Sequence, residues 1–113
     1  GLRFANGLAL DAGEEYLYLA QTAADNVVRF RIRGGTLGKA EIYGPDRFGT
    51  RVFPDGIAFD AEGNLWTSLV LANKIVAIAP SGAVLPIAED ASGTLINKPS
   101  NIAFGGADMR DVY

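Results

Sequence analysis

Hydrophobic and polar residues alternate along most of this chain with a period of two. The pattern is clearest in Gly7–Asp11 and Tyr16–Ala20, on either side of one short turn, and in Gly56–Asp60 and Leu65–Leu69, on either side of another. Two alternating runs around a glycine-containing turn predict a β-hairpin. No segment shows the 3.6-residue period of an amphipathic helix, so the sequence predicts an all-β protein.

Two further strands are predicted after each hairpin. The third strands are Asn26–Ile32 and Asn73–Ala79, and the weaker fourth strands are Gly38–Gly44 and Ala83–Ala88. Because Pro86 has no backbone N–H to donate, its strand is predicted to lie at the edge of a sheet.

The same arrangement recurs along the chain. Leu8, Ile57 and Ile102 occupy equivalent positions, spaced by roughly 45–50 residues, and each is followed by alanine. Four antiparallel strands in a repeat of this length are typical of a β-propeller blade. We therefore expect a propeller fragment of about two and a half blades, with units at 4–50, 51–96 and an incomplete 97–113. A sandwich or meander of about ten strands is the alternative.

Composition narrows the chemistry that this chain can perform. It has 113 residues with a net charge of −3 and contains no His and no Cys. Their absence excludes, within this chain, His- or Cys-ligated zinc, disulfides, a thiol nucleophile and a Ser-His-Asp triad. No basic run predicts nucleic-acid binding, and no apolar run is long enough to cross a membrane.

The beginning of the chain gives little information on its compartment. It shows no signal peptide and no initiating Met, so we expect the sequence to start inside a longer protein. The compartment stays open, with the cytoplasm slightly favoured.

Three side chains that carry oxygen precede the innermost strands of the predicted blades: Asn6, Asp55 and Ser100. Because the first strand of every blade lines the central channel, these equivalent positions converge on its axis. Amide, carboxylate and hydroxyl oxygens suit a hard divalent cation such as Ca²⁺. Asn-Gly and Pro-Asp-Gly are also common turn sequences, so a purely structural role in turns is the competing interpretation.

Four segments carry a resemblance to a known family. They are ANGLALDAGEEYLYLAQT at 5–22, VVRFRI at 27–32, FPDGIAFDAEGNLW at 53–66 and PSNIAFGG at 99–106. In this order and spacing they resemble the six-bladed propellers of the gluconolactonase, regucalcin and senescence-marker-protein family. The resemblance covers essentially the whole chain, as roughly the later half of a family member.

The resemblance implies one divalent metal ion held on the channel axis by a Glu, an Asn and an Asp. Asn6 matches the Asn and Asp55 matches the Asp, whereas the Glu and a substrate-contacting Asn belong upstream of this chain. The resemblance also implies that Asp55 is the general base that activates water. Ser100 and Asn101 become candidates for lining the substrate pocket. Ca²⁺ is the expected ion, with Zn²⁺, Mg²⁺ and Mn²⁺ as alternatives.

The implied activity is hydrolysis of sugar lactones or related cyclic esters, in which the metal polarises the carbonyl group and Asp55 takes a proton from water. Because the Glu ligand is missing, the fragment alone is expected to be inactive. Its expected partners are the small lactone or ester and the remaining blades of the propeller, with no nucleic acid and no membrane.

A binding platform for protein or RNA is the alternative function, because the segments DGIAFDAEGNLW and NKIVAIAPSG also resemble NHL-repeat propellers. Strictosidine-synthase-like propellers are a further group with similar ANGLAL strands. Asn6-Gly7, Phe104–Gly106 and the acidic balance, which suits RNA poorly, favour the hydrolase.

The remaining polar residues receive structural interpretations. Arg29, Arg31 and Arg33 are expected on a solvated strand face, with Phe30 and Ile32 buried on the opposite face.

Asp11 and Asp60 are expected to cap turns, and Trp66 is expected to pack within a blade at the position that matches Tyr18. No residue of the loop 44–52 is singled out.

Overall fold

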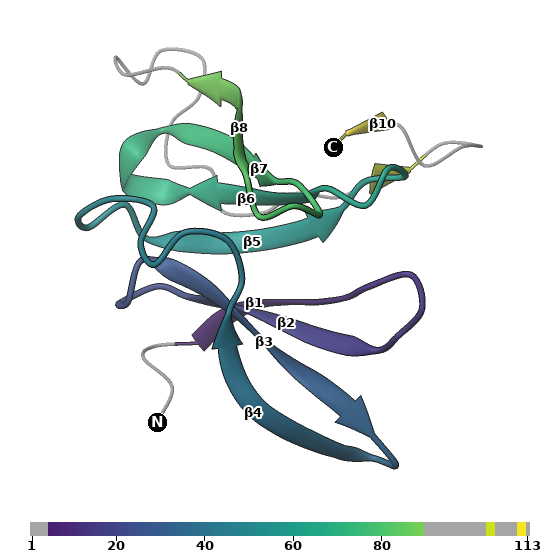
Figure 1. The fold of residues 1–113 in the computed structure, drawn as a ribbon. Coiled ribbons are helices and arrows are strands. Elements are labelled where there is room, and N and C mark those ends of the chain that lie inside the picture. The colour runs from purple at the N-terminus through teal and green to yellow at the C-terminus, as the bar shows by residue number, and fades with distance from the viewer. Residues whose placement is uncertain (1–4, 90–103, 106–110, 113) are drawn as a thin grey trace.

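The computed structural model describes residues 5–89, 104–105 and 111–112, with side chains for residues 7–89. Two four-stranded antiparallel sheets lie one above the other (Figure 1). The first sheet consists of β1 (Ala5–Leu10), β2 (Tyr16–Gln21), β3 (Asn26–Arg33) and β4 (Thr36–Ile42). The second consists of β5 (Pro54–Phe59), β6 (Leu65–Leu69), β7 (Lys74–Ile78) and β8 (Val84–Glu89). In both sheets each strand pairs with the next one in the chain, which is the meander of a propeller blade.

All eight strands predicted from the alternating pattern in these two repeats are present, with ends that differ by about two residues at most. Pro86 lies in β8, an edge strand, as predicted. Asn73 is not part of β7, because it adopts a left-handed conformation (φ 50°) at the end of the 3₁₀ helix η1 (Val70–Ala72). Among the described residues, no helix is long and apolar enough to cross a membrane.

The third repeat is described only in part. The strands β9 (Phe104–Gly105) and β10 (Asp111–Val112) pair antiparallel, within the unit predicted at 97–113. Ser100 and Asn101 lie outside the described residues. The exact bounds of the three blade units stay a prediction.

The hydrophobic core lies between the two blades rather than inside either one. Tyr18, Ala20 and Val27 of the first blade pack against Ile57, Leu65 and Ile78 of the second, and all six are buried. The Tyr18 ring meets the rings of Tyr43 and Phe59 edge-on, at 4.9 Å between centroids in both pairs. Burial of this shared face holds the two inner strands, β1 and β5, in contact.

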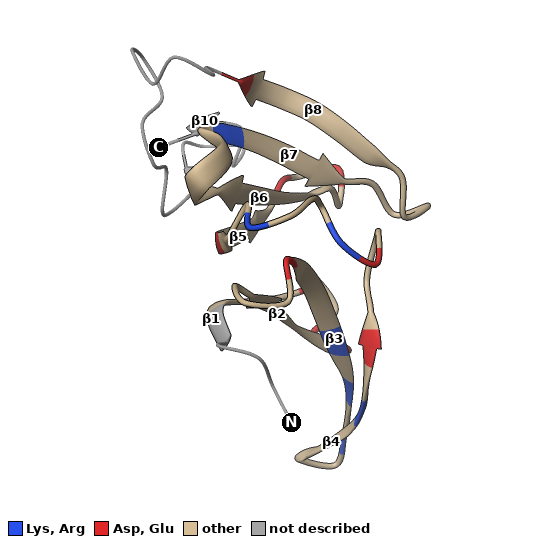
Figure 2. Ribbon diagram, turned by 90° about the vertical axis from the view of Figure 1, so that its left-hand side faces the viewer, with Lys and Arg blue, Asp and Glu red and all other residues tan. Residues whose placement is uncertain are grey.

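The arginine face of β3 differs from the prediction at one position. Figure 2 shows the charged residues of the first blade on β3 and β4 and in its turns, and β2 has none. Arg31 and Arg33 are exposed, as expected. Arg29 is only partly exposed, because its guanidinium group lies over the Tyr16 ring at 4.1 Å and pairs with Glu41. Aromatic residues on the same face therefore cover this arginine.

The opposite face of β3 also differs from the prediction. Phe30 and Ile32 are half-buried rather than buried. The next strand in the sheet, β4, is exposed at every position. The first sheet therefore has no covering layer on the outer part of this face among the described residues.

Candidate functional site

Both inner strands contain the same irregularity at the predicted ligand positions. Within 5–8 of β1 and within 54–57 of β5, the inner strand has one residue more than the strand it pairs with. Such a β-bulge bends a strand and re-aims its side chains, and bulges are common beside active sites. Asn6 lies in the first bulge and Asp55 in the second. The repeat predicted that Asn6 and Asp55 occupy equivalent positions, and the backbone has the same bulge at both.

The two bulges lie against each other. A Cβ atom added to Gly7 would overlap the carbonyl oxygen of Asp55, so only glycine permits this approach of β1 to β5. The backbone of Asn6 belongs to β1, but its side chain lies outside the part described. The structure thus brings the two bulges together.

The Asp55 carboxylate is half-buried, and this burial raises its pKa above the ordinary value for aspartate. Among the side chains and backbone groups of residues 7–89, no hydrogen-bond donor or cation contacts it. Burial makes the ionised carboxylate less stable, and no neighbouring residue offsets this loss. A bound cation would offset it. Asp55 therefore fits a ligand of a hard divalent ion.

A strand residue of the second blade and a turn residue of the first anchor the peptide groups on both sides of Asp55. Ser68 Oγ accepts a hydrogen bond of 2.9 Å from the backbone N–H of Gly56, and it donates to the Gly56 carbonyl oxygen at 3.4 Å. Thr22 Oγ1, from the first blade, donates to the carbonyl oxygen of Pro54 at 2.9 Å. Ser68 satisfies the N–H that the bulge removes from the strand ladder.

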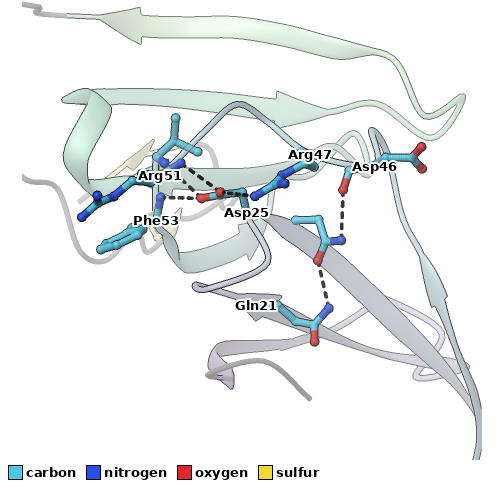
Figure 3. Close-up of polar contacts among 8 residues, drawn as sticks. Gln21, Asp25, Asp46, Arg47, Arg51 and Phe53 are labelled. Atoms are coloured by element: carbon cyan, nitrogen blue, oxygen red, sulfur yellow. Dashed lines mark hydrogen bonds and ion pairs between the residues drawn. The ribbon is translucent and has the colours of Figure 1, made fainter. Parts of the chain in front are cut away.

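A buried aspartate that the sequence analysis did not single out holds the chain just before Asp55. Asp25 is 2% exposed and accepts hydrogen bonds from three successive backbone N–H groups, those of Arg51, Val52 and Phe53 (Figure 3). Its other contact is an ion pair with Arg47 at 3.1 Å. Burial opposes ionisation of Asp25, but these hydrogen bonds outweigh it and hold its pKa below the ordinary value.

The other aspartates of the inner hairpins have the structural role predicted for them. Asp11 accepts hydrogen bonds from the backbone N–H groups of Glu15 and Tyr16. Asp60 accepts from the backbone of Asn64 at 2.8 Å and from the indole N–H of Trp66 at 2.9 Å. Both cap the turns that close their hairpins, so neither is a candidate ligand.

A cavity of about 500 Å³ lies elsewhere, between the hairpin turns of the two blades. Its lining includes Tyr18, Arg29, Tyr43, Phe59 and Asp60. It opens at the end of β5 that is remote from Asp55, and its turn aspartates are already bonded to backbone groups. We therefore place the candidate site at the bulges and not in this cavity.

The described residues supply only part of a metal site. They contain no group of three or more Asp and Glu side chains that could share one ion. A cation at the bulges would be bound by Asp55 and by the residue at position 6, and it would need further oxygen ligands from outside the described residues.

Comparison with known proteins shows what this arrangement is similar to. The family model described as "SMP-30/Gluconolactonase/LRE-like region" matches residues 1–113. The 6-deoxy-6-sulfogluconolactonase of Pseudomonas putida is 28% identical over 110 residues, which are 96% of this chain and 36% of that protein. The adipocyte plasma membrane-associated protein Hemomucin of Drosophila melanogaster is 36% identical over 69 residues, 61% of this chain and 11% of that protein.

The fold has the same relatives among solved structures. The gluconolactonase XC5397 from Xanthomonas campestris superimposes with a TM-score of 0.74 at 26% identity, over 95% of this chain and 33% of that one. This chain therefore spans about a third of the length of each gluconolactonase that it matches.

Proposed function

The chain belongs to the SMP-30/gluconolactonase/LRE-like family, and from this premise we propose that the intact protein hydrolyses sugar lactones or related cyclic esters. The observation that carries the proposal is the pair of matched β-bulges on β1 and β5. They bring the backbone of Gly7 against Asp55, whose half-buried carboxylate has no hydrogen-bond donor among the described residues. The gluconolactonase relatives indicate the substrate class.

We assign Asn6 and Asp55 as ligands of one divalent ion, with Ca²⁺ first and Zn²⁺, Mg²⁺ or Mn²⁺ as alternatives. All the side-chain donors assigned are oxygens, which suits these hard ions. A third ligand, a Glu, is expected from the part of the intact protein that precedes these residues. When bound, the ion supplies Lewis-acid polarisation of the lactone carbonyl.

The chain's own contribution to the reaction centres on Asp55. Its carboxylate accepts a proton from a water molecule while the water oxygen attacks the lactone carbonyl carbon. The ring C–O bond then breaks, the leaving oxygen takes up a proton, and the product is a hydroxy acid. Burial raises the pKa of Asp55 in the absence of an ion, and a bound cation favours the ionised carboxylate that accepts the proton. Ser68 and Thr22 keep the peptide groups on both sides of this carboxylate in place.

The remaining blades of the propeller are the proposed structural partner. The central channel and the third ligand both require chain beyond the two blades described. On this proposal, residues 1–113 alone bind the ion weakly and do not hydrolyse lactones. Ser100 and Asn101 remain proposed as pocket residues on the basis of the resemblance.

The proposal is tested with the intact protein by titrating Ca²⁺ calorimetrically and by following hydrolysis of a gluconolactone. Asp55→Asn should weaken ion binding at least tenfold and lower kcat/KM by about 10²–10⁴. Asp46→Asn removes the same charge from an exposed loop position and should change neither quantity. The proposal fails if the wild type binds no divalent ion, or if Asp55→Asn binds and turns over like the wild type. That result would favour a binding platform instead.

A further inference from the structure

We propose that Asp25 is the positioning residue of the site: its carboxylate fixes the backbone of residues 51–53 and thereby sets where the Asp55 side chain points. The inference rests on the proposed function, because it assigns a role to Asp25 at that same site. Asp25 does not itself contact substrate or ion in this proposal. It acts from the first blade on a segment of the second.

The first argument is the geometry of the segment that Asp25 holds. Arg51 and Phe53 have left-handed backbones, with φ of 55° and 57°. For residues other than glycine this conformation is strained, and it persists only where the surroundings enforce it. The three successive N–H groups of residues 51–53 point toward one carboxylate, and such a concave set of backbone donors is an anion site known as a nest. The anion in this nest is the carboxylate of Asp25.

The second argument is the completeness of the contact. One oxygen of Asp25 accepts from Val52 at 3.0 Å and from Phe53 at 3.2 Å, and the other accepts from Arg51 at 2.9 Å. The guanidinium group of Arg47 donates to the second oxygen at 3.1 Å. Figure 3 shows these bonds converging on the one carboxylate. Asp25 therefore supplies the acceptors that this stretch of loop lacks within its own backbone.

The third argument is the position of the segment next to Asp55. On its other side it is bonded to the second blade, because the N–H groups of Val70 and Leu71 donate to the carbonyl oxygens of Phe53 and Val52, both at 3.1 Å. The segment is thus clamped between two blades, and only Pro54 separates it from Asp55. Pro54 has a fixed φ angle, so it transmits the orientation of Phe53 to Asp55 with little slack.

The turn that carries Asp25 makes further contacts with the same region. Asn26 donates to the backbone oxygen of Asp46 at 3.0 Å, and it accepts from Gln21 at 2.9 Å. The Phe48 N–H donates to the backbone oxygen of Asp25 at 2.8 Å. Asp25 itself has a left-handed φ of 59°, which Asp and Asn tolerate better than other side chains. Asn is therefore the substitution that preserves the turn while removing the charge and one acceptor.

The test compares Asp25→Asn with Asp60→Asn in the intact protein. Asp60 is a matched control, because this half-buried aspartate also accepts from several donors, and its pKa is also held below the ordinary value. It caps the opposite end of β5 and does not contact residues 51–53. The readouts are the Kd for Ca²⁺, the separate values of kcat and KM for lactone hydrolysis, and the Tm.

Both variants should lose thermal stability. Only Asp25→Asn should also weaken Ca²⁺ binding, by about 10–100-fold, as expected when a residue that orients a metal ligand is changed. It should lower kcat more than it raises KM, because a displaced Asp55 still admits substrate. Hydrogen exchange at the amides of Arg51, Val52 and Phe53 should accelerate in Asp25→Asn and stay unchanged in Asp60→Asn.

Two further measurements distinguish an effect of the Asp25 charge from an effect on the position of Asp55: the variant Arg47→Met and the dependence of Ca²⁺ binding on ionic strength. Arg47→Met removes the neighbouring positive charge but leaves the three backbone bonds to Asp25, so it should bind Ca²⁺ within about threefold of the wild type. A loss in Asp25→Asn that disappears at high ionic strength would be a long-range charge effect and would overturn the inference. The inference is also overturned if Asp25→Asn and Asp60→Asn bind Ca²⁺ equally well while Asp55→Asn does not. If the wild type binds no ion, the proposed function fails first and this inference fails with it.

Discussion

At the residue scale, three aspartates of this chain differ in their surroundings, although the side chain is the same. Asp25 and Asp60 are surrounded by donors that hold their pKa values below the ordinary value for aspartate. Asp55, which has no donor among the described residues, has its pKa raised by burial. Asp25 and Asp60 are thus stabilised by their neighbours, whereas the lack of such stabilisation at Asp55 fits the ligand and base role proposed for it. The contrast separates Asp55 from the other two within one chain.

Acidification should reveal the structural role of Asp60. Its folded-state pKa is lowered, so its contribution to the free energy of unfolding is present above the unfolded value of about 3.9 and is lost as pH falls through the folded value. Asp60→Asn should therefore be about 1–2 kcal/mol less stable than the wild type at pH 7, and this difference should shrink toward pH 3. Urea unfolding of the intact protein from pH 7 to pH 3 measures both quantities.

The exposed residue Asp46 provides the control for this pH experiment. Asp46→Asn should follow the wild-type curve at every pH, because its side chain has no partner among the described residues. A constant difference between Asp60→Asn and the wild type across the whole pH range would show that Asp60 stabilises the turn without its charge.

Sequence reasoning proposed Asp55 as a site residue but did not single out Asp25 or Ser68, and the reason is physical. Asp55 repeats the position of Asn6, and a repeat is visible in a sequence. Asp25 acts through backbone N–H groups of a loop more than twenty residues away, which no spacing rule predicts. Ser68 stands in a strand where the matching residue of the first blade is Ala20. The sequence did hold one indication of the role of Ser68. A polar residue in an otherwise apolar strand is expected to be buried and therefore needs a hydrogen-bond partner.

At the element scale, the contact between β1 and β5 depends on Gly7. A methyl group at this position would overlap the Asp55 carbonyl oxygen, and the overlapped atom belongs to the backbone and cannot rotate away. Gly7→Ala should therefore separate the two inner strands and destabilise the intact protein by about 1–3 kcal/mol. Because it displaces Asp55, it should also weaken Ca²⁺ binding. Thermal unfolding and calorimetric titration of the same sample measure the two effects.

Gly13 offers a matched control in the turn that follows β1. A Cβ there would meet only the flexible Glu15 side chain at 3.4 Å or beyond, and the backbone is not left-handed. Gly13→Ala should leave ion binding unchanged and alter stability by less than about 1 kcal/mol. Equal behaviour of the two alanine variants would contradict the close approach of the bulges.

The strands themselves followed closely from the sequence, because a half-buried antiparallel strand must alternate in polarity. The departures lie where contacts between elements decide the outcome. Asn73 lies outside β7, at the end of the 3₁₀ helix. Arg29 is covered by Tyr16 of β2 and by Tyr43, which follows β4. The alternating pattern also did not predict the bulges, because one extra residue in a strand alters the alternation at only one position.

At the scale of the whole molecule, the two blades cover each other on one face, and apolar side chains among residues 7–89 remain exposed elsewhere. Leu8 and Leu10 of β1 are 61% and 46% exposed, and the outer strand β8 exposes Leu85 and Ile87 at 41% and 40%. Apolar residues gathered on blade faces in this way are normally covered by the neighbouring blades of a closed propeller. The family match over the whole chain, at about a third of the length of its gluconolactonase relatives, agrees with blades that lie beyond these residues.

The isolated polypeptide 1–113 should therefore associate with itself. Its exposed apolar faces and the edge of β8, which pairs with no further strand in the described part of the chain, offer both hydrophobic and backbone contacts to another copy. Sedimentation velocity at increasing concentration should show a rising average mass, whereas the double variant Leu85→Lys and Ile87→Lys should sediment as a smaller species, since charges on an edge strand oppose pairing. The exposed pair Lys39→Glu and Asp46→Lys leaves the apolar faces intact and should associate like the unmodified chain. A monomer at all concentrations would mean that these faces need no covering, which would argue against their place inside a larger propeller.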